Sequence, residues 1–255
     1  MENIDIITFA LVFIRVAAVV FLMPVLGHKL VPKTAKIIII LGLTMATYSS
    51  AAGQIHELPK SLGMALLIIQ EIMVGAGIAI ISQVIFSSIQ IAGQLISYQS
   101  GLAMANIIDP NTHNSISPFG VFIIAISMLV WLALDAHHTL ILGLMESIKL
   151  IPIGEWAITS FDVNMIIDAG RGMFIAGLQI AAPALLLITL IYVALAIMSK
   201  AVPQIQVFFI SFPLTLGAGI FVLGVSLPAI IILISQHYGG MGEVILEFIQ
   251  NGASK

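Results

Sequence analysis

Most of this chain of 255 residues consists of long apolar runs, and one of these runs carries a regular series of polar residues. Between residues 83 and 97 a polar residue recurs every three or four positions, so on a helix these residues form one stripe. The stripe consists of Gln83, Ser87, Gln90, Gln94 and Ser97. Unpaired amides and hydroxyls are costly in hydrocarbon, which predicts that this helix faces protein or water at membrane depth. A channel, a transporter and a tightly packed membrane assembly would each meet this condition.

The same segment carries small residues at a spacing of four, which form a ridge on a helix. They are Gly93, Ser97, Gly101 and Ala105. Such a ridge allows the backbone of another helix to come close, so we predict a helix-packing site there. A run of Asx, apolar and Pro residues follows the ridge and predicts a loop. It consists of Asn106, Ile107, Ile108, Asp109, Pro110 and Asn111.

The apolar runs predict membrane-spanning helices, each of which needs about 20 apolar residues. The candidate spans are residues 4–27, 34–52, 62–90, 116–134, 164–182, 183–200 and 204–236. The segment 137–151 is short for a full crossing, and the segment 241–250 has the pattern of an amphipathic tail helix. The chain is therefore expected to be an all-α, polytopic membrane protein with a single membrane domain over residues 1–255.

Two features predict interruptions in these helices. One helix over residues 62–108 would be about 70 Å long, far more than a bilayer is thick. We therefore predict a break near Gly93, with residues 94–108 as a separate helix buried in protein. Pro183, Pro213 and Pro228 lie inside apolar runs. Since proline removes a helical hydrogen bond, the C-terminal helices are expected to be kinked.

The composition independently indicates a membrane protein. Hydrophobic residues make up 60% of the chain, charged residues only 8%, and the mean hydropathy is +1.16. Soluble domains carry about 25% charged residues. The net charge of −3 provides no basic surface for a nucleic acid, and the absence of cysteine excludes disulfides and thiolate chemistry.

Three charged residues lie within apolar segments: Arg15, Glu71 and Arg171. A charge at such depth costs about 3 kcal/mol on insertion scales and is usually paired inside a bundle. One interpretation is a proton or ion relay of a secondary transporter. The other is structural pairing, within the chain or with a neighbouring subunit, and the small number of acidic residues in the spans favours it.

The sequence Asp135-Ala136-His137-His138 resembles part of a metal site. Adjacent histidines on a helix point about 100° apart, and no HExxH or third-ligand pattern accompanies them, so an interfacial helix end is the favoured interpretation. The chain also lacks GxSxG, a P-loop and a GxGxxG turn, which predicts a protein that is not an enzyme. No cofactor and no metal are expected.

Several short motifs lie in a fixed order along nearly the whole chain. The first two are Arg15-x(8)-Pro24-x-x-Gly27-x(4)-Pro32 and Glu71-x-x-x-Gly75. The central motif, AGQLISYQSGL, runs from Ala92 to Leu102 and is followed by Asp109-Pro110. The remaining motifs are His137-His138, PQIQVF at 203–208 and FPLTL at 212–216. Together these motifs resemble the FliR/SpaR/SctT family of type III secretion export-gate subunits. The chain departs from the family pattern at Gln94, where many members have Glu, and at Ser211, where Gly often precedes Phe-Pro.

The resemblance implies a non-enzymatic core subunit of the flagellar type III export gate, in the bacterial inner membrane and the flagellar basal body. Its implied partners are FliP and FliQ homologues, together with FlhB and FlhA homologues, unfolded export substrates and membrane lipid. The implied architecture is a FliP-like part over about residues 1–182, a FliQ-like helical hairpin over 183–236 that turns near Lys200–Pro203, and a tail over 237–255. A loop of this subunit resembles the plug of the pore, and by motif it is Asn106–Ser115.

A secondary transporter of a small solute, based on Glu71 and Arg15, is the alternative function. Such a transporter predicts an internal inverted repeat around a site at the bilayer midplane. The two halves of the sequence show no self-similarity. The export-gate interpretation is therefore preferred.

Overall fold

The computed structural model describes residues 2–27, 31–51, 61–101, 118–156, 163–202 and 207–253, and within these ranges all regular structure is helical. The helices are α1 (Glu2–Leu22), α2 (Lys33–Ala51), α3 (Ser61–Gln99), α5 (Pro118–Ala133), α6 (Ala136–Leu150), α7 (Val163–Ala201), α8 (Val207–Gly239) and α9 (Met241–Ala253). The prediction of an all-α fold is confirmed for the described residues.

Five segments of these helices are long and apolar enough to cross a membrane. They lie in α1, α2, α3 and α7, and in the continuous stretch formed by α8 and α9; α5 and α6 together form a bent pair that would be a sixth span. The loop segment Asn106–Asn111 and the turn at residues 203–206 lie outside the described residues. The prediction of a polytopic membrane protein is confirmed at this level.

The predicted break near Gly93 is wrong, because α3 runs without interruption from Ser61 to Gln99. Its 39 residues give a length of about 58 Å. Gly93 serves close packing instead, since a Cβ atom there would lie 2.5 Å from Cα of Gly120 in α5. The helix ends at Gln99, and Gly101 lies in the turn that follows, with a φ of 80° that favours glycine.

The two spans predicted at 164–182 and 183–200 are one helix, α7, which contains Pro183. Proline removes one backbone donor, but the flanking residues still satisfy the helical pattern, so the helix continues through it. Likewise, α8 contains both Pro213 and Pro228. The kinks predicted at these prolines stay a prediction.

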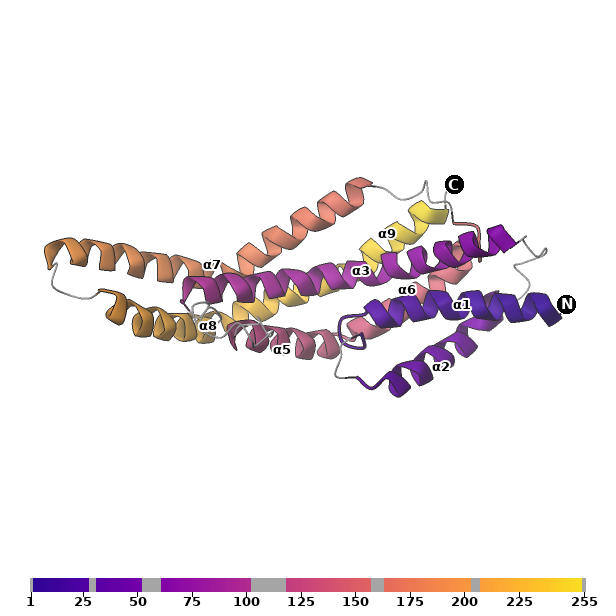
Figure 1. Cartoon of the computed structure of the whole chain (residues 1–255), viewed down its shortest axis with the longest axis horizontal. Helices are drawn as coiled ribbons and strands as arrows, with labels where there is room; N and C mark the ends of the chain where they lie inside the picture. Colours follow the sequence, from indigo (N-terminus) through magenta and orange to yellow (C-terminus); the bar gives the residue numbers. More distant parts are fainter. Residues whose placement is uncertain are drawn as a thin grey trace. The chain divides into compact units, whose positions relative to one another are not determined.

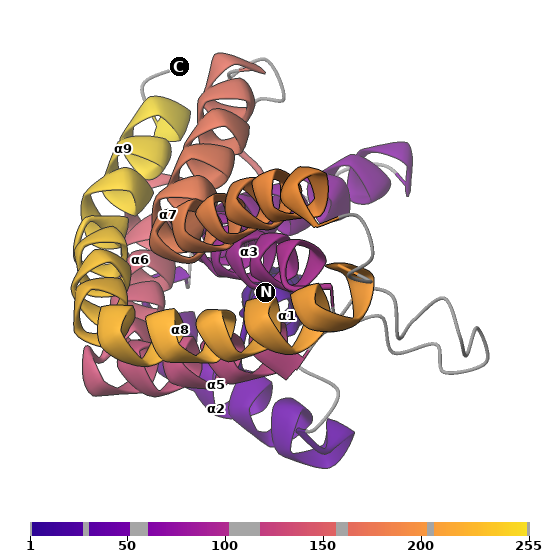
Figure 2. The ribbon, with the colours of Figure 1, turned by 90° about the vertical axis from the view of Figure 1, so that its left-hand side faces the viewer.

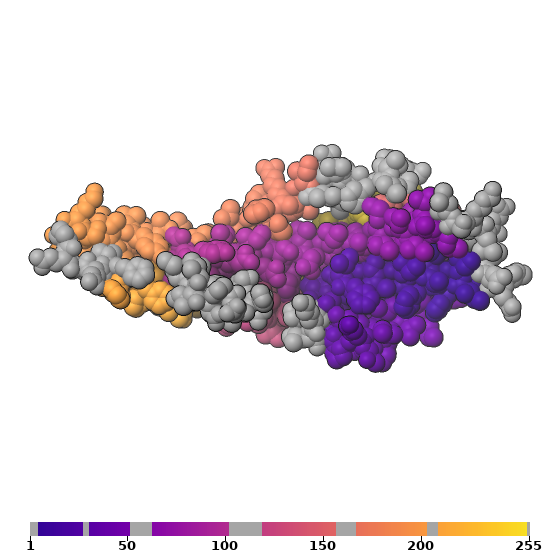
Figure 3. Space-filling model, in the orientation of Figure 1, coloured from indigo at the N-terminus to yellow at the C-terminus, as the bar shows by residue number. Residues whose placement is uncertain are grey.

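The chain divides into two compact units, and each is described by itself. Unit 1 comprises Met1–Val84, Trp131–Ala169 and His237–Lys255. In it α1 packs against α2, α2 against α6, and α6 against α9. Figure 1 shows the ribbons of α1 and α2 side by side, and Figure 3 shows their neighbouring surfaces.

Glycines in unit 1 make room for large side chains of α9. A Cβ atom on Gly77 would lie 2.2 Å from the ring of Phe248, and one on Gly143 would lie 2.6 Å from Ile245. Phe248 and Ile245 belong to the buried face of α9, so the predicted amphipathic tail helix packs its apolar side against the protein.

Unit 2 comprises Ile85–Val130 and Gly170–Gln236. Within it the second part of α3 lies between α7 and α8 (Figure 2). Small residues again set the helix spacing, because a Cβ atom on Gly177 of α7 would lie 2.9 Å from the carbonyl oxygen of Ser88 in α3. Contacts between backbones are thus a repeated packing device of this unit.

Candidate functional site

The two mid-span charges Arg15 and Glu71 form a buried, two-point ion pair in unit 1. Arg15 Nε donates to Glu71 Oε2 at 2.6 Å, and Arg15 Nη2 donates to Glu71 Oε1 at 3.2 Å. Both side chains have an exposed fraction of 0%. A bidentate guanidinium–carboxylate contact is the strongest and most directional ion pair available to a protein, and it joins α1 to α3 here.

Arg15 also binds the C-terminal end of α6. Its Nη1 donates to the carbonyl oxygens of Ser147 at 2.9 Å and Ile151 at 3.0 Å. The carbonyl oxygen of Ser147 also accepts a hydrogen bond from the amide of Ile151, and the carbonyls near the end of a helix carry the negative end of its dipole, so a cation is favoured there. Arg15 therefore connects three separate segments of the chain.

Two glycines shape the surroundings of Glu71. The amide of Gly154 donates to Glu71 Oε1 at 2.9 Å, and Gly154 has a φ of 81° that disfavours other residues. Gly75 lies one turn after Glu71, and a Cβ atom there would lie 2.5 Å from the carbonyl oxygen of Arg15. The close approach of α1 and α3 that this glycine allows brings the two charges within bonding distance.

The arrangement indicates a structural role for the pair. Both Glu71 oxygens accept hydrogen bonds, and three nitrogens of Arg15 donate them. Neither side chain has contact with solvent. A proton relay needs a group that exchanges partners or meets water, whereas this pair is fully bonded, so the geometry favours structural pairing within the chain.

The third charge behaves differently. Arg171 was predicted to be buried, but it lies exposed on α7. Arg171 is in an apolar segment that could span a membrane. Because its helix packs other faces inward, such as the one at Gly177, the guanidinium points outward. Among the described residues no ion pair of Arg171 is found, so pairing with a neighbouring subunit stays a prediction for this residue.

The end of α3 in unit 2 is the second candidate site, because it leads into the predicted loop. The carbonyl oxygen of Gln99, the last residue of α3, accepts a hydrogen bond from Tyr192 Oη at 2.9 Å. The next carbonyl oxygen, that of Ser100, lies 3.2 Å from Thr215 Oγ1, whose single hydrogen is also within reach of Ser211 O at 2.9 Å and Phe212 O at 3.2 Å. The side chain of Gln99 in turn donates to Thr189 Oγ1 at 3.1 Å. These bonds fix the point at which the chain leaves α3.

The ridge residues lie along this same part of α3. Gly93 faces Gly120, Ser97 is buried, and a Cβ atom on Gly101 would lie 3.3 Å from the ring of Phe212. Ala105 and the loop Asn106–Asn111 lie outside the described residues. The chain buries the polar stripe only in part, since Ser97 is buried, Gln83, Ser87 and Gln90 are half-buried, and Gln94 is exposed.

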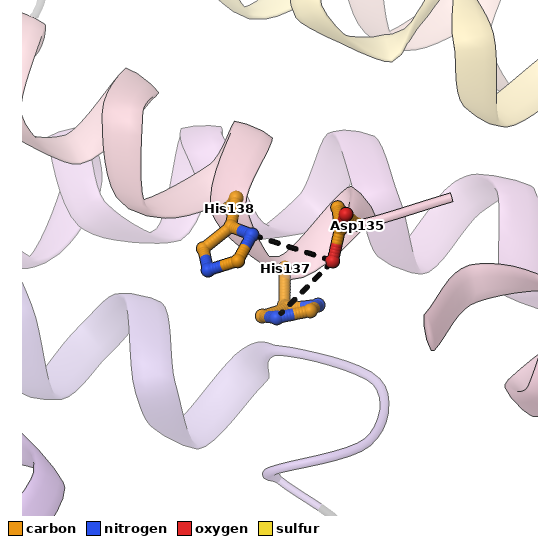
Figure 4. Close-up of side chains that lie close together, drawn as sticks. All are labelled: Asp135, His137 and His138. Carbon is orange, nitrogen blue, oxygen red and sulfur yellow. Dashed lines mark ion pairs between the residues drawn. The ribbon is translucent and has the colours of Figure 1, made fainter. Parts of the chain in front are cut away.

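Asp135, His137 and His138 lie together where α6 begins (Figure 4). Neighbouring histidines on a helix were expected to point away from each other. In the structure the two imidazole rings lie 4.2 Å apart between centroids, and Asp135 is close to both. The side chains of this cluster are therefore close enough to act on one ligand.

The backbone groups that complete these sites were not predicted from the sequence. Gly154 follows Pro152 in a turn-like sequence, which was a usable signal for a loop. The carbonyls of Ser147 and Ile151 gave no signal, since every residue has one. Tyr192 and Thr215 gave none either, because their partners are about 90 or more positions away in sequence.

Comparison with known proteins identifies the chain. Residues 6–241 match the family described as "Bacterial export proteins, family 1". The chain is 31% identical over 238 residues to the flagellar biosynthetic protein FliR of Bacillus subtilis, with 90% of each chain covered. This chain belongs to the FliR family. It is also 28% identical to FliR of Aquifex aeolicus, covering 96% of this chain and 95% of the relative, and 28% identical to FliR of Escherichia coli, covering 92% and 91%.

Membership of the FliR family determines the general function. The protein is a component of the flagellar type III export apparatus and is not an enzyme. Its candidate spans agree with a multi-pass protein of the bacterial inner membrane. The sites described above therefore belong to a protein of the flagellar export apparatus.

Proposed function

We propose that the chain forms, with FliP and FliQ homologues, the pore through which unfolded flagellar proteins cross the inner membrane. The proposal rests on polar side chains that are exposed on helices long enough to cross a membrane. Gln94 on α3 and Arg171 on α7 are both exposed in the single chain. Because lipid would reject these groups, neighbouring subunits or a water-filled lumen must surround them.

Three parts of the chain take different places in this assembly. Residues 183–236 form the FliQ-like hairpin, with the second half of α7 and most of α8 as its arms. Support comes from the large apolar side chains exposed along both arms, for example Leu186 and Ile197 on α7 and Phe221 on α8. Residues 1–182 form the FliP-like part, and residues 237–255 form the tail. FlhB and FlhA homologues are the further partners.

The loop Asn106–Asn111 acts as the plug that closes the pore at rest. Support for this role comes from the described residues just before the loop. The carbonyl oxygens of Gln99 and Ser100 lie within hydrogen-bonding distance of Tyr192 and Thr215, which hold the chain where it leaves α3. The sequence of the loop supplies Ile107 and Ile108 as apolar filling and Asn106 and Asn111 as groups that can bond to neighbouring backbone. A loop at membrane depth is tolerated where protein or a cavity surrounds it.

Purification in mild detergent with a native mass measurement tests the proposed assembly. Co-expression with FliP and FliQ homologues should give one large complex that contains all three proteins. Expressed without them, the chain should aggregate or be degraded, because its exposed polar groups lack partners. A well-behaved monomer or dimer that ignores the co-expressed proteins would contradict the proposal.

A further inference from the structure

We propose that Asp135, His137 and His138 bind one divalent transition-metal ion. Each residue offers one ligand atom, and these atoms lie within 4.8 Å of one another. Asp135 Oδ1 lies 3.4 Å from His138 Nδ1 and 3.9 Å from His137 Nε2 (Figure 4). The carboxylate oxygen is thus the common neighbour of both imidazoles.

The backbone of Asp135 places its carboxylate in this position. Asp135 immediately precedes α6, where an aspartate usually accepts a hydrogen bond from the helix N-terminus, yet its side chain makes no capping bond. The residue instead adopts a left-handed conformation with φ 51°, the only positive φ of a non-glycine residue in the described chain. Few non-glycine residues adopt this conformation, and aspartate is among those that do so most readily. Left-handed residues of this kind are concentrated at functional positions.

The orientation of His137 leaves one particular nitrogen for binding. Its ring packs against Trp131 with centroids 5.6 Å apart, and Nδ1 is buried without a hydrogen-bond partner among the described residues. Nε2 is therefore the nitrogen available to a ligand, and it is the atom near Asp135. His138 and Asp135 are more open, with side-chain exposed fractions of 64% and 69%.

The donor set determines the class of ion. Two imidazole nitrogens and one carboxylate oxygen suit Zn²⁺, Co²⁺, Ni²⁺ or Cu²⁺, whereas Mg²⁺ and Ca²⁺ prefer oxygen ligands. Metal–ligand bonds of about 2.0–2.2 Å bring ligand atoms to about 3.3 Å from one another. The open side chains of Asp135 and His138 can close the remaining gap by rotation. Water would occupy the other coordination positions, and the negative charge of Asp135 offsets the positive end of the α6 dipole.

Cobalt binding to the purified export complex that contains the full chain tests the proposal. We expect visible absorption bands of four- or five-coordinate Co²⁺ at one equivalent per copy of this chain, displaced by Zn²⁺. His138→Ala and Asp135→Asn should each weaken Co²⁺ binding about tenfold or more, since even outer-shell changes can cost this much. Asparagine tolerates the left-handed conformation, so Asp135→Asn removes the charge and keeps the backbone.

His237→Ala is the matched control, because His237 lies in α8 outside the cluster and its loss should leave Co²⁺ binding unchanged. The elution volume of each variant complex reports whether the fold and the assembly are intact. Absence of Co²⁺ bands in the intact complex would mean that the cluster is only a carboxylate–imidazole ion pair. Equal binding by the intact complex and by both cluster variants would place the ion elsewhere, and either result overturns the proposal.

Discussion

The amide of Gly154 donates a hydrogen bond of 2.9 Å to Glu71 Oε1, although the two residues are 83 positions apart in the sequence. This bond completes the coordination of a carboxylate that Arg15 already holds at two points. The same Arg15 binds the last carbonyls of α6. One buried carboxylate and one guanidinium thus hold α1, α3 and the end of α6 together.

Neutralising Glu71 should destabilise the protein without changing how export uses energy. Glu71→Gln leaves Arg15 buried without its counter-charge, and removing one partner of a buried pair costs about 3–5 kcal/mol. We expect a lower yield of assembled complex and a lower melting temperature in detergent. The response of residual export to a proton ionophore should match that of the unmodified protein.

Glu146→Gln is the control for this experiment. Glu146 pairs with Lys149 at 3.0 Å on the surface of α6, and exposed pairs contribute about 0–1 kcal/mol. Its melting temperature should change little. If the Glu71→Gln complex assembles normally but its export activity no longer depends on the proton gradient, the result would support the relay interpretation.

Adding a single methyl group at Gly75 should separate α1 from α3. The Cβ atom of Gly75→Ala would lie 2.5 Å from a backbone oxygen of Arg15, which cannot move without shifting the helix. Overpacking of this kind costs about 1–3 kcal/mol. Thermal unfolding of the purified complex measures the effect.

Gly42→Ala is the matched substitution in another helix. Nothing lies within 4 Å of a Cβ atom at Gly42 in α2, so the helix propensity of alanine should stabilise the chain by about 0.5–1 kcal/mol. Equal effects of the two substitutions would show that the contact at Gly75 is not a tight one.

Substitution of Gly101 should impair assembly at the end of α3. Gly101→Leu places a branched side chain at φ 80° and beside the ring of Phe212, so both backbone strain and crowding oppose it. Gly101→Asn relieves most of the strain, because asparagine tolerates this conformation. We expect swimming motility and complex yield to fall in the order Gly, Asn, Leu. Normal swimming of the Gly101→Leu strain would contradict a close contact there.

Deleting residues 107–112 should open the proposed plug. The deletion leaves the helix-end bonds of Gln99 and Ser100 in place, so the complex should still assemble. Cells that express it should become permeable to ions and small molecules, measured as conductance against the intact complex. Full assembly with conductance at the level of the intact complex would exclude this loop as the plug.

The sequence by itself determined the membrane class, the helical content and the family. Long apolar runs leave no other regular structure in lipid than helices or closed barrels. They predicted the ends of α2, α5 and α8 to within a few residues, whereas α3 is longer than predicted and α7 is one helix where two were predicted. The sequence also predicted that Arg15 and Glu71 need partners, because charges in apolar segments are costly.

Only the tertiary structure decided what those partners are. The bonds of Arg15 to Ser147 and Ile151 use backbone carbonyls, which every residue possesses, so no sequence pattern distinguishes them. A break was predicted near Gly93 because one helix over residues 62–108 would be longer than a bilayer is thick. Instead α3 continues through Gly93, whose missing side chain allows close contact with Gly120. The cluster of Asp135 with two histidines likewise depends on a left-handed residue, whose conformation is fixed by the chain around it rather than by its identity.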